Sequence, residues 1–129
     1  MIKNILWNFE KERFSSIKEF EKALINYNET IKEEVFKVSL DTKIVKCAEV
    51  VIQYSHWSEE EDDIVEPSFL LKANNDSFFT PLELLYKVHN TVCEKLKDED
   101  HKFFEGFDLW EGENPNHPDV PLYFLELGS

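Results

Sequence analysis

Three carboxylates and one imidazole stand side by side at Asp98, Glu99, Asp100 and His101. These groups bind metal ions and transfer protons, so the segment is a first candidate for a metal or catalytic site. Consecutive residues rarely converge on one ion, and the sequence does not show that another histidine comes near. The simpler interpretation is a polar turn after a helix, because aspartate side chains bond readily to nearby backbone groups.

A second acidic segment, "HWSEEEDDIVE", contains five consecutive acids. Burying unpaired carboxylates is too costly, so we expect residues 56–67 to form a solvated loop between two strands. Three roles remain open for this loop: keeping the protein soluble, docking a basic protein with Trp57 as an aromatic anchor, or binding calcium. Calcium has the least support, because the alternating ligands and central glycine of an EF-hand loop are missing.

His89 and Cys93 are four residues apart on a predicted helix, which allows contact between them. Both fall on its inward side, where a thiol is a poor nucleophile and a histidine is usually a core residue. The chain has no glycine-rich phosphate loop, no GxSxG and no HExxH. His117 has no visible partner. We therefore predict no catalytic residue, no cofactor and no metal ligand.

The charge is strongly negative, with 27 acidic against 14 basic residues and a net charge of −13. Phosphate backbones and anionic membranes repel such a chain, so we expect neither nucleic acid nor a membrane as partner. A basic protein is favoured, although the acidity can also serve solubility alone. Segment 1–13 has no apolar run typical of a signal peptide, and no stretch reaches transmembrane length. The two cysteines form no CxxC pattern. Together these features predict a cytoplasmic location.

Two helices are clearly marked. Capping boxes at Ser16–Glu19 and Thr80–Glu83 mark their starts, and Pro81 occupies the first position of the second helix. Apolar residues then recur at helical spacing. The pattern predicts helices from about 16 to 30 and from 81 to near 97.

Strands are expected over the remaining apolar segments. They are 1–9, 35–40, 44–54, 68–73, 102–110 and 120–128. The last is almost continuously apolar and should lie inside a sheet, and Gly106 marks a bulge or a close contact. The order β-α-β-β-β-α-β-β predicts one α+β domain over 1–129. Its mainly antiparallel sheet would have about five to six strands, with two helices packed on one face.

The closing segment contains Asp100-His101, Phe103-Phe104-Glu105-Gly106, Pro121-x-Tyr123 and Leu127-Gly128-Ser129. With these features it resembles the C-terminal portion of small acidic bacterial immunity proteins, which neutralise toxins of neighbouring cells. The resemblance implies a cytosolic, non-enzymatic inhibitor that binds a cognate toxin domain. It carries no individual binding residue across, because proteins of this class have many folds.

We therefore expect a non-catalytic inhibitor of a basic, nuclease-like toxin. An acidic surface would speed the encounter and cover a groove built for phosphates. The predicted partner-binding residues are Trp57, Glu59, Glu60, Glu61, Asp62, Asp63 and Glu66, with Asp108, Glu111 and Glu113 as a second patch beside Trp110. Two alternatives are a small hydrolase using histidine and carboxylates, and a structural or regulatory subunit of a complex.

Overall fold

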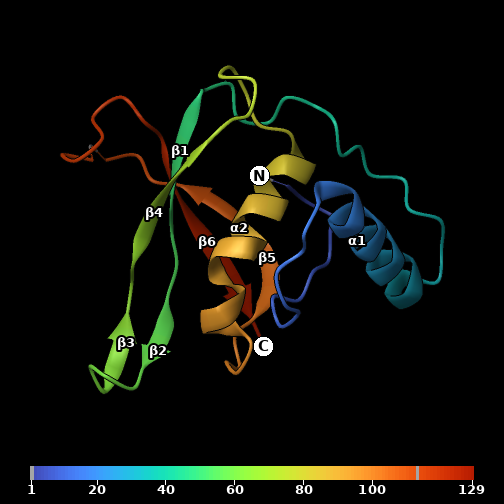
Figure 1. The fold of residues 1–129 in the computed structure, drawn as a ribbon, viewed down its shortest axis with the longest axis horizontal. Coiled ribbons are helices and arrows are strands. Elements are labelled where there is room, and N and C mark those ends of the chain that lie inside the picture. Colours follow the sequence, from blue (N-terminus) through green and yellow to red (C-terminus); the bar gives the residue numbers. More distant parts are fainter. Residues whose placement is uncertain (1, 113) are drawn as a thin grey trace.

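The computed structural model describes residues 2–112 and 114–129. Within these residues the protein has two helices and six strands (Figure 1). The elements are α1 (Ile17–Lys32), β1 (Glu49–Gln53), β2 (His56–Ser58), β3 (Asp63–Val65), β4 (Ser68–Lys72), α2 (Pro81–Leu96), β5 (Phe103–Leu109) and β6 (Leu122–Gly128). The predicted α+β class is confirmed, but the chain order is α-β-β-β-β-α-β-β.

Four strands form the main sheet in the order β4-β1-β6-β5, and β2 and β3 form a separate ribbon. The β1–β4 and β5–β6 pairs are antiparallel, whereas β1 and β6 run parallel. The apolar strand β6 lies inside the sheet, as predicted. The register of β5 shifts between Phe104 and Gly106, where Gly106 has a φ of 135°. Of the two possibilities that the sequence left open at Gly106, a bulge or a close contact, the register shift shows the bulge. Only glycine adopts this φ easily.

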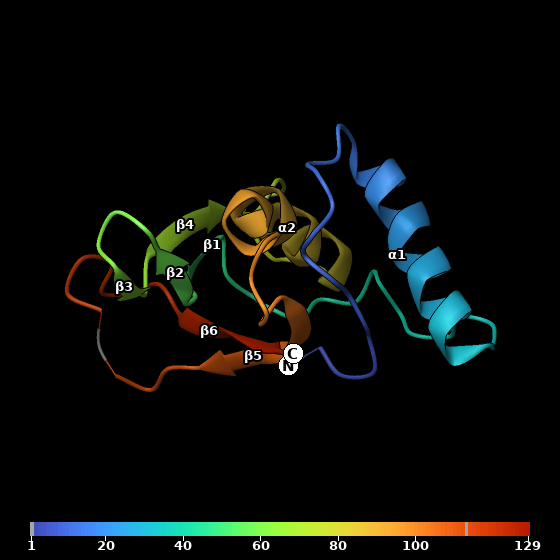
Figure 2. The same cartoon turned by 90° about the horizontal axis from the view of Figure 1, so that it is seen from below.

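The two helices do not cover the sheet equally (Figure 2). Helix α2 lies over one face of the sheet, and its buried side chains enter the core. They include Leu84, Leu85, Val88, Val92 and Leu96. Helix α1 lies farther out, with the N-terminal segment between it and α2 (Figure 2). The prediction that both helices pack on one face of the sheet therefore holds directly only for α2.

The predicted first strand over 1–9 is wrong. Within residues 2–9 the structure has one isolated antiparallel β-bridge, which joins Asn8 to Phe103. Ile2 and Asn4 have φ values of 60° and 66°, in the left-handed region, which interrupts an extended run. Ile5, Trp7 and Phe9 are buried, and they enter the core from an irregular segment.

The predicted strand over 35–40 is also wrong. This segment belongs to neither sheet. Phe36, Val38 and Leu40 pack against the core, so their alternation reports burial without strand pairing. The Phe36 amide donates to the Glu29 carboxylate over 2.8 Å, which provides a partner that a neighbouring strand would otherwise supply. The predicted strand over 44–54 is reduced to β1.

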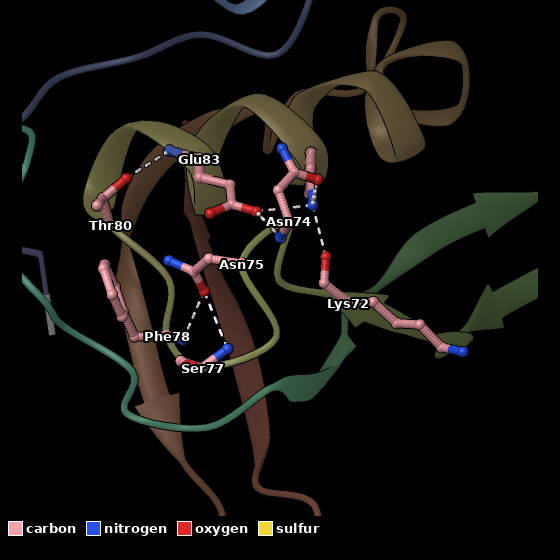
Figure 3. Close-up of polar contacts among 8 residues, drawn as sticks. Lys72, Asn74, Asn75, Ser77, Phe78, Thr80 and Glu83 are labelled. Carbon is pink, nitrogen blue, oxygen red and sulfur yellow. Dashed lines mark hydrogen bonds and ion pairs between the residues drawn. The ribbon is translucent and has the colours of Figure 1, made fainter.

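The start of α2 is fixed to the end of β4 by a polar network (Figure 3). Thr80 Oγ1 accepts a hydrogen bond from the Glu83 amide over 3.1 Å, which confirms the Thr80 half of the predicted capping box. The Glu83 carboxylate accepts from the Asn74 amide over 2.8 Å and from Lys87 Nζ over 2.7 Å. Lys87 Nζ also donates to the backbone carbonyl of Lys72. These bonds set where α2 crosses the sheet, and its far end then lies toward the β2–β3 ribbon (Figure 1).

Candidate functional site

The acidic run is carried by an arm, residues 55–66, that projects beyond the sheet (Figure 1). The expected loop over 56–67 is wrong, because β2 and β3 pair antiparallel and prolong the β1–β4 hairpin. Only residues 59–62 form the turn. The five consecutive acids, Glu59 to Asp63, are all exposed, so the expectation that they are solvated is confirmed. Backbone pairing in a ribbon satisfies the main chain while the carboxylates stay in water.

The base of the arm is anchored in the protein core by Tyr54. Its amide donates to the Pro67 carbonyl over 3.2 Å, and its ring stacks on His56 with centroids 5.5 Å apart. The Gln53 side chain donates to the Glu66 carbonyl over 3.2 Å. Burial raises the pKa of the Tyr54 hydroxyl, which therefore stays neutral. The arm thus leaves the sheet in a defined direction.

The turn after α2 lies against the arm. The backbone amide of Trp57 donates to Oε1 of Glu99, which is 42 positions away in the sequence. His56 and Glu99 line two adjacent hollows of about 380 and 300 Å³. The first also takes in Glu59, Glu60, Lys95 and Asp98, and the second Ile64, Asp100 and His101. Two acidic segments that the sequence presents separately therefore form one surface, which we call the arm surface.

The segment after α2 is a turn, as the sequence predicts. Helix α2 ends at Leu96, and the Glu99 amide donates to the Leu96 carbonyl over 3.0 Å. The sequence did not show whether another histidine comes near, and in the structure His56 and His101 line the same hollow. Among the described residues, no three His, Cys, Asp or Glu side chains are grouped so that they could hold a metal ion.

An exposed apolar pair lies on the arm. Trp57 and Ile64 are directly opposite each other across the ribbon, and they are 45% and 55% exposed. Large apolar side chains ringed by charge are typical anchors in protein interfaces. The sequence indicated Trp57 but not Ile64. Only the pairing register of β2 with β3 places Ile64 beside the tryptophan.

The second predicted patch divides between two places. Asp108 lies on β5, where its side chain hydrogen-bonds Glu126 of β6 and raises the pKa of that carboxyl, aided by burial and by the charges of Asp108 and Glu105. Trp110 lines a different hollow, of about 420 Å³, together with Glu66 from the base of the arm. Glu111 is exposed, and Glu113 lies outside the described residues.

His89 is a core residue, in agreement with the simpler interpretation of the sequence. Trp7 Nε1 donates to its Nδ1 over 3.0 Å, and its Nε2 lies 3.1 Å from the Glu12 carbonyl. The ring is therefore a neutral tautomer that donates from Nε2, and burial lowers its pKa. Burial raises the pKa of the Cys93 thiol, which keeps it protonated. His117 lines the hollow beside Trp110.

Within residues 2–112 and 114–129, neither helix is long and apolar enough to cross a membrane. Compared with known proteins, the chain matches no family model, no curated protein and no solved structure.

Proposed function

We propose that the protein is a non-catalytic inhibitor that binds a basic partner protein through the arm surface. One observation supports this proposal most. The arm contacts the turn after α2, and the exposed Trp57–Ile64 pair lies on the resulting surface. Carboxylates attract the partner from a distance, and the apolar pair gives the contact that holds it. In this role the arm is a preformed recognition element.

The arm is suited to recognition by side chains. Two backbone amides on its strands are taken by carboxylates: Trp57 donates to Glu99, and Ile64 donates to Asp63 Oδ1 over 2.7 Å. Occupied amides discourage another strand from pairing with the arm. A partner therefore meets carboxylates and the Trp57–Ile64 pair.

A toxin domain is the partner class that we favour. The net charge of −13 complements a nuclease, whose active groove must be basic to hold phosphates. Segment 100–129, which resembles immunity proteins, includes two residues at the arm surface, Asp100 and His101. We propose that the complex forms in the cytoplasm, where a nuclease would meet its substrate, and that the arm surface covers the phosphate-binding groove.

A small hydrolase is the second candidate. One observation favours it: His56, His101 and Glu99 line a common hollow of about 300 Å³. An imidazole and a carboxylate in one hollow are the parts of a general acid–base pair. If this alternative holds, replacing either histidine by glutamine would abolish turnover of an ester or phosphodiester substrate and leave binding of basic proteins unchanged.

The main proposal is tested with a partner captured at low salt. One variant neutralises the turn of the arm through Glu60→Gln, Glu61→Gln and Asp62→Asn. A matched control removes the same charge near α1 through Glu21→Gln, Glu33→Gln and Glu34→Gln. We expect the arm variant alone to slow association by roughly tenfold or more at low salt, and raised salt to remove the difference. Equal association rates for both variants would refute the role of the arm.

A further inference from the structure

A hollow of about 420 Å³ lies between the sheet face that points away from α2 and the residues Trp110 and Asn114 to His117. Its floor is formed by Gln53 of β1, Ser68 of β4 and Phe124 of β6. The residues next to them in these strands, such as Ile52 and Leu125, enter the core under α2, which assigns the floor to the opposite face. Trp110 forms one wall, and Glu66 lies at the rim shared with the arm. We call this hollow the Trp110 pocket.

The position of the Trp110 ring is set by its surroundings. The Trp110 amide donates to the Leu122 carbonyl over 2.8 Å, which continues the pairing of β5 with β6. A Cβ atom added to Gly112 would lie 2.4 Å from Cζ2 of the indole, so the ring rests directly against the Gly112 backbone. Trp110 is still 37% exposed. An aromatic wall is therefore held in place before any ligand arrives.

The polar groups of the pocket are suited to a cation. The Gln53 side-chain nitrogen donates to the Glu66 carbonyl, and an amide oxygen such as that of Gln53 is an acceptor. Ser55 donates to Glu66 Oε1 over 3.3 Å, so the second carboxylate oxygen can accept from a ligand. Among the residues that the structure describes, no lysine or arginine lines the pocket. An anion would be repelled, and an apolar ligand would strip water from the Glu66 carboxylate without replacing its hydrogen bonds.

We propose that the Trp110 pocket receives an arginine side chain of the basic partner; this inference rests on the proposed function. A guanidinium is flat and can stack on the indole of Trp110 while its edge donates to Glu66 and Gln53. A lysine ammonium cannot stack in this way. The Trp110 pocket borders the arm surface, because Ser55, which lines the arm surface, donates to Glu66 of the pocket.

The probe for this pocket is Nα-acetyl-arginine amide, titrated into the full ¹⁵N-labelled chain and followed by NMR. The indole signals of Trp57 and Trp110 are assigned with the variants Trp57→Phe and Trp110→Leu. We expect saturable shifts in the millimolar range for the Trp110 indole and for the Gln53 and Phe124 amides. The neutral isostere Nα-acetyl-citrulline amide should cause no shift, and Nα-acetyl-lysine amide should bind more weakly. Equal binding of the lysine and arginine probes would overturn the assignment.

Three variants show whether the shifts come from this pocket. Glu66→Gln should weaken binding roughly two- to fivefold, as expected for an exposed ion pair. Trp110→Leu should abolish it, and Trp57→Phe should leave it unchanged. Equal shifts of the Trp57 and Trp110 indoles would mean diffuse counterion binding and refute the pocket. If the arginine probe does not bind but neutralising the arm still slows association with the partner, only this inference is refuted. Arginine binding without any effect of the arm variant refutes the proposed function instead.

Discussion

The indole of Trp7 donates a hydrogen bond over 3.0 Å to Nδ1 of His89, 82 positions away. The bond joins the N-terminal segment to α2 inside a cluster of aromatic rings, with Phe20 of α1 packed edge-on to Trp7. Only a neutral imidazole can accept it. This one bond therefore links the stability of the core to the protonation state of His89.

We predict a loss of stability between neutral and mildly acidic pH that depends on His89. Burial lowers its pKa in the folded protein, so below pH about 6.5 the unfolded chain binds a proton that the folded chain does not. Stability is then complete above the unfolded pKa and falls as pH drops toward the folded one. Urea unfolding from pH 8 to pH 5 measures this. In His89→Gln the free energy of unfolding should decrease less between pH 8 and pH 5 than in the unchanged protein. Its value at pH 8 should be lower by about 1–3 kcal/mol. An unchanged pH profile would remove His89 as the cause.

A second prediction concerns the attachment of the arm. Glu99→Ala removes the acceptor of the Trp57 amide, so this amide should exchange hydrogen faster, together with its ribbon neighbours. Global stability should change by less than about 0.5 kcal/mol, because the site is exposed. Hydrogen exchange by NMR gives both quantities. Asp98→Ala is the control and should leave the Trp57 amide as it is; a similar acceleration in that control would contradict the assignment to Glu99.

Gly106→Ala should destabilise the protein by about 1–3 kcal/mol. The residue has a φ of 135°, and a side chain makes this conformation costly. The substitution removes no side-chain contact, so the loss of stability measures the cost of placing a side chain at this backbone conformation. Thermal or urea unfolding checks the value, with Glu105→Ala in the same bulge as a control. A loss no larger than in the control would show that β5 can straighten its register.

Asp108→Asn should lower the pKa of the Glu126 carboxyl. The Asp108 hydrogen bond and charge raise that pKa, so the folded protein holds a proton more tightly than the unfolded chain. Stability contributed by this pair is therefore present at low pH and lost as pH rises through the Glu126 titration. A ¹³C NMR titration of Glu126 measures the shift. Glu105→Gln should cause a smaller change, and the reverse order would contradict the importance of the hydrogen bond.

The helices could be predicted because the signals that start them are local. Ser16 and Thr80 cap amides three residues away, so their effect can be read from neighbouring letters. The alternating segment over 35–40 shows the limit of such signals. Alternation says that one side of an extended chain is buried, but it does not say whether the covering element is a strand or a helix. Here Phe36 and Val38 pack without a strand partner.

The arm surface could be predicted only in parts. Five consecutive acids had to be exposed, and Trp57 could be recognised as an aromatic residue at their edge. The contact between Trp57 and Glu99 depends on where α2 ends in space, which follows from the packing of the whole domain. The Trp110 pocket depends likewise on the parallel pairing of β1 with β6. Neither juxtaposition has a signature in neighbouring residues.

The place of β6 in the sheet also bears on when the protein can fold during synthesis. Among the described strands β6 comes last in the chain, yet it lies between β1 and β5 in the sheet. Until residues 122–128 have left the ribosome, the inner edge of β1 has no partner and β5 cannot join the sheet. Contacts this distant in sequence slow folding and leave strand edges open to aggregation. We therefore expect the four-stranded sheet to assemble only after β6 has emerged.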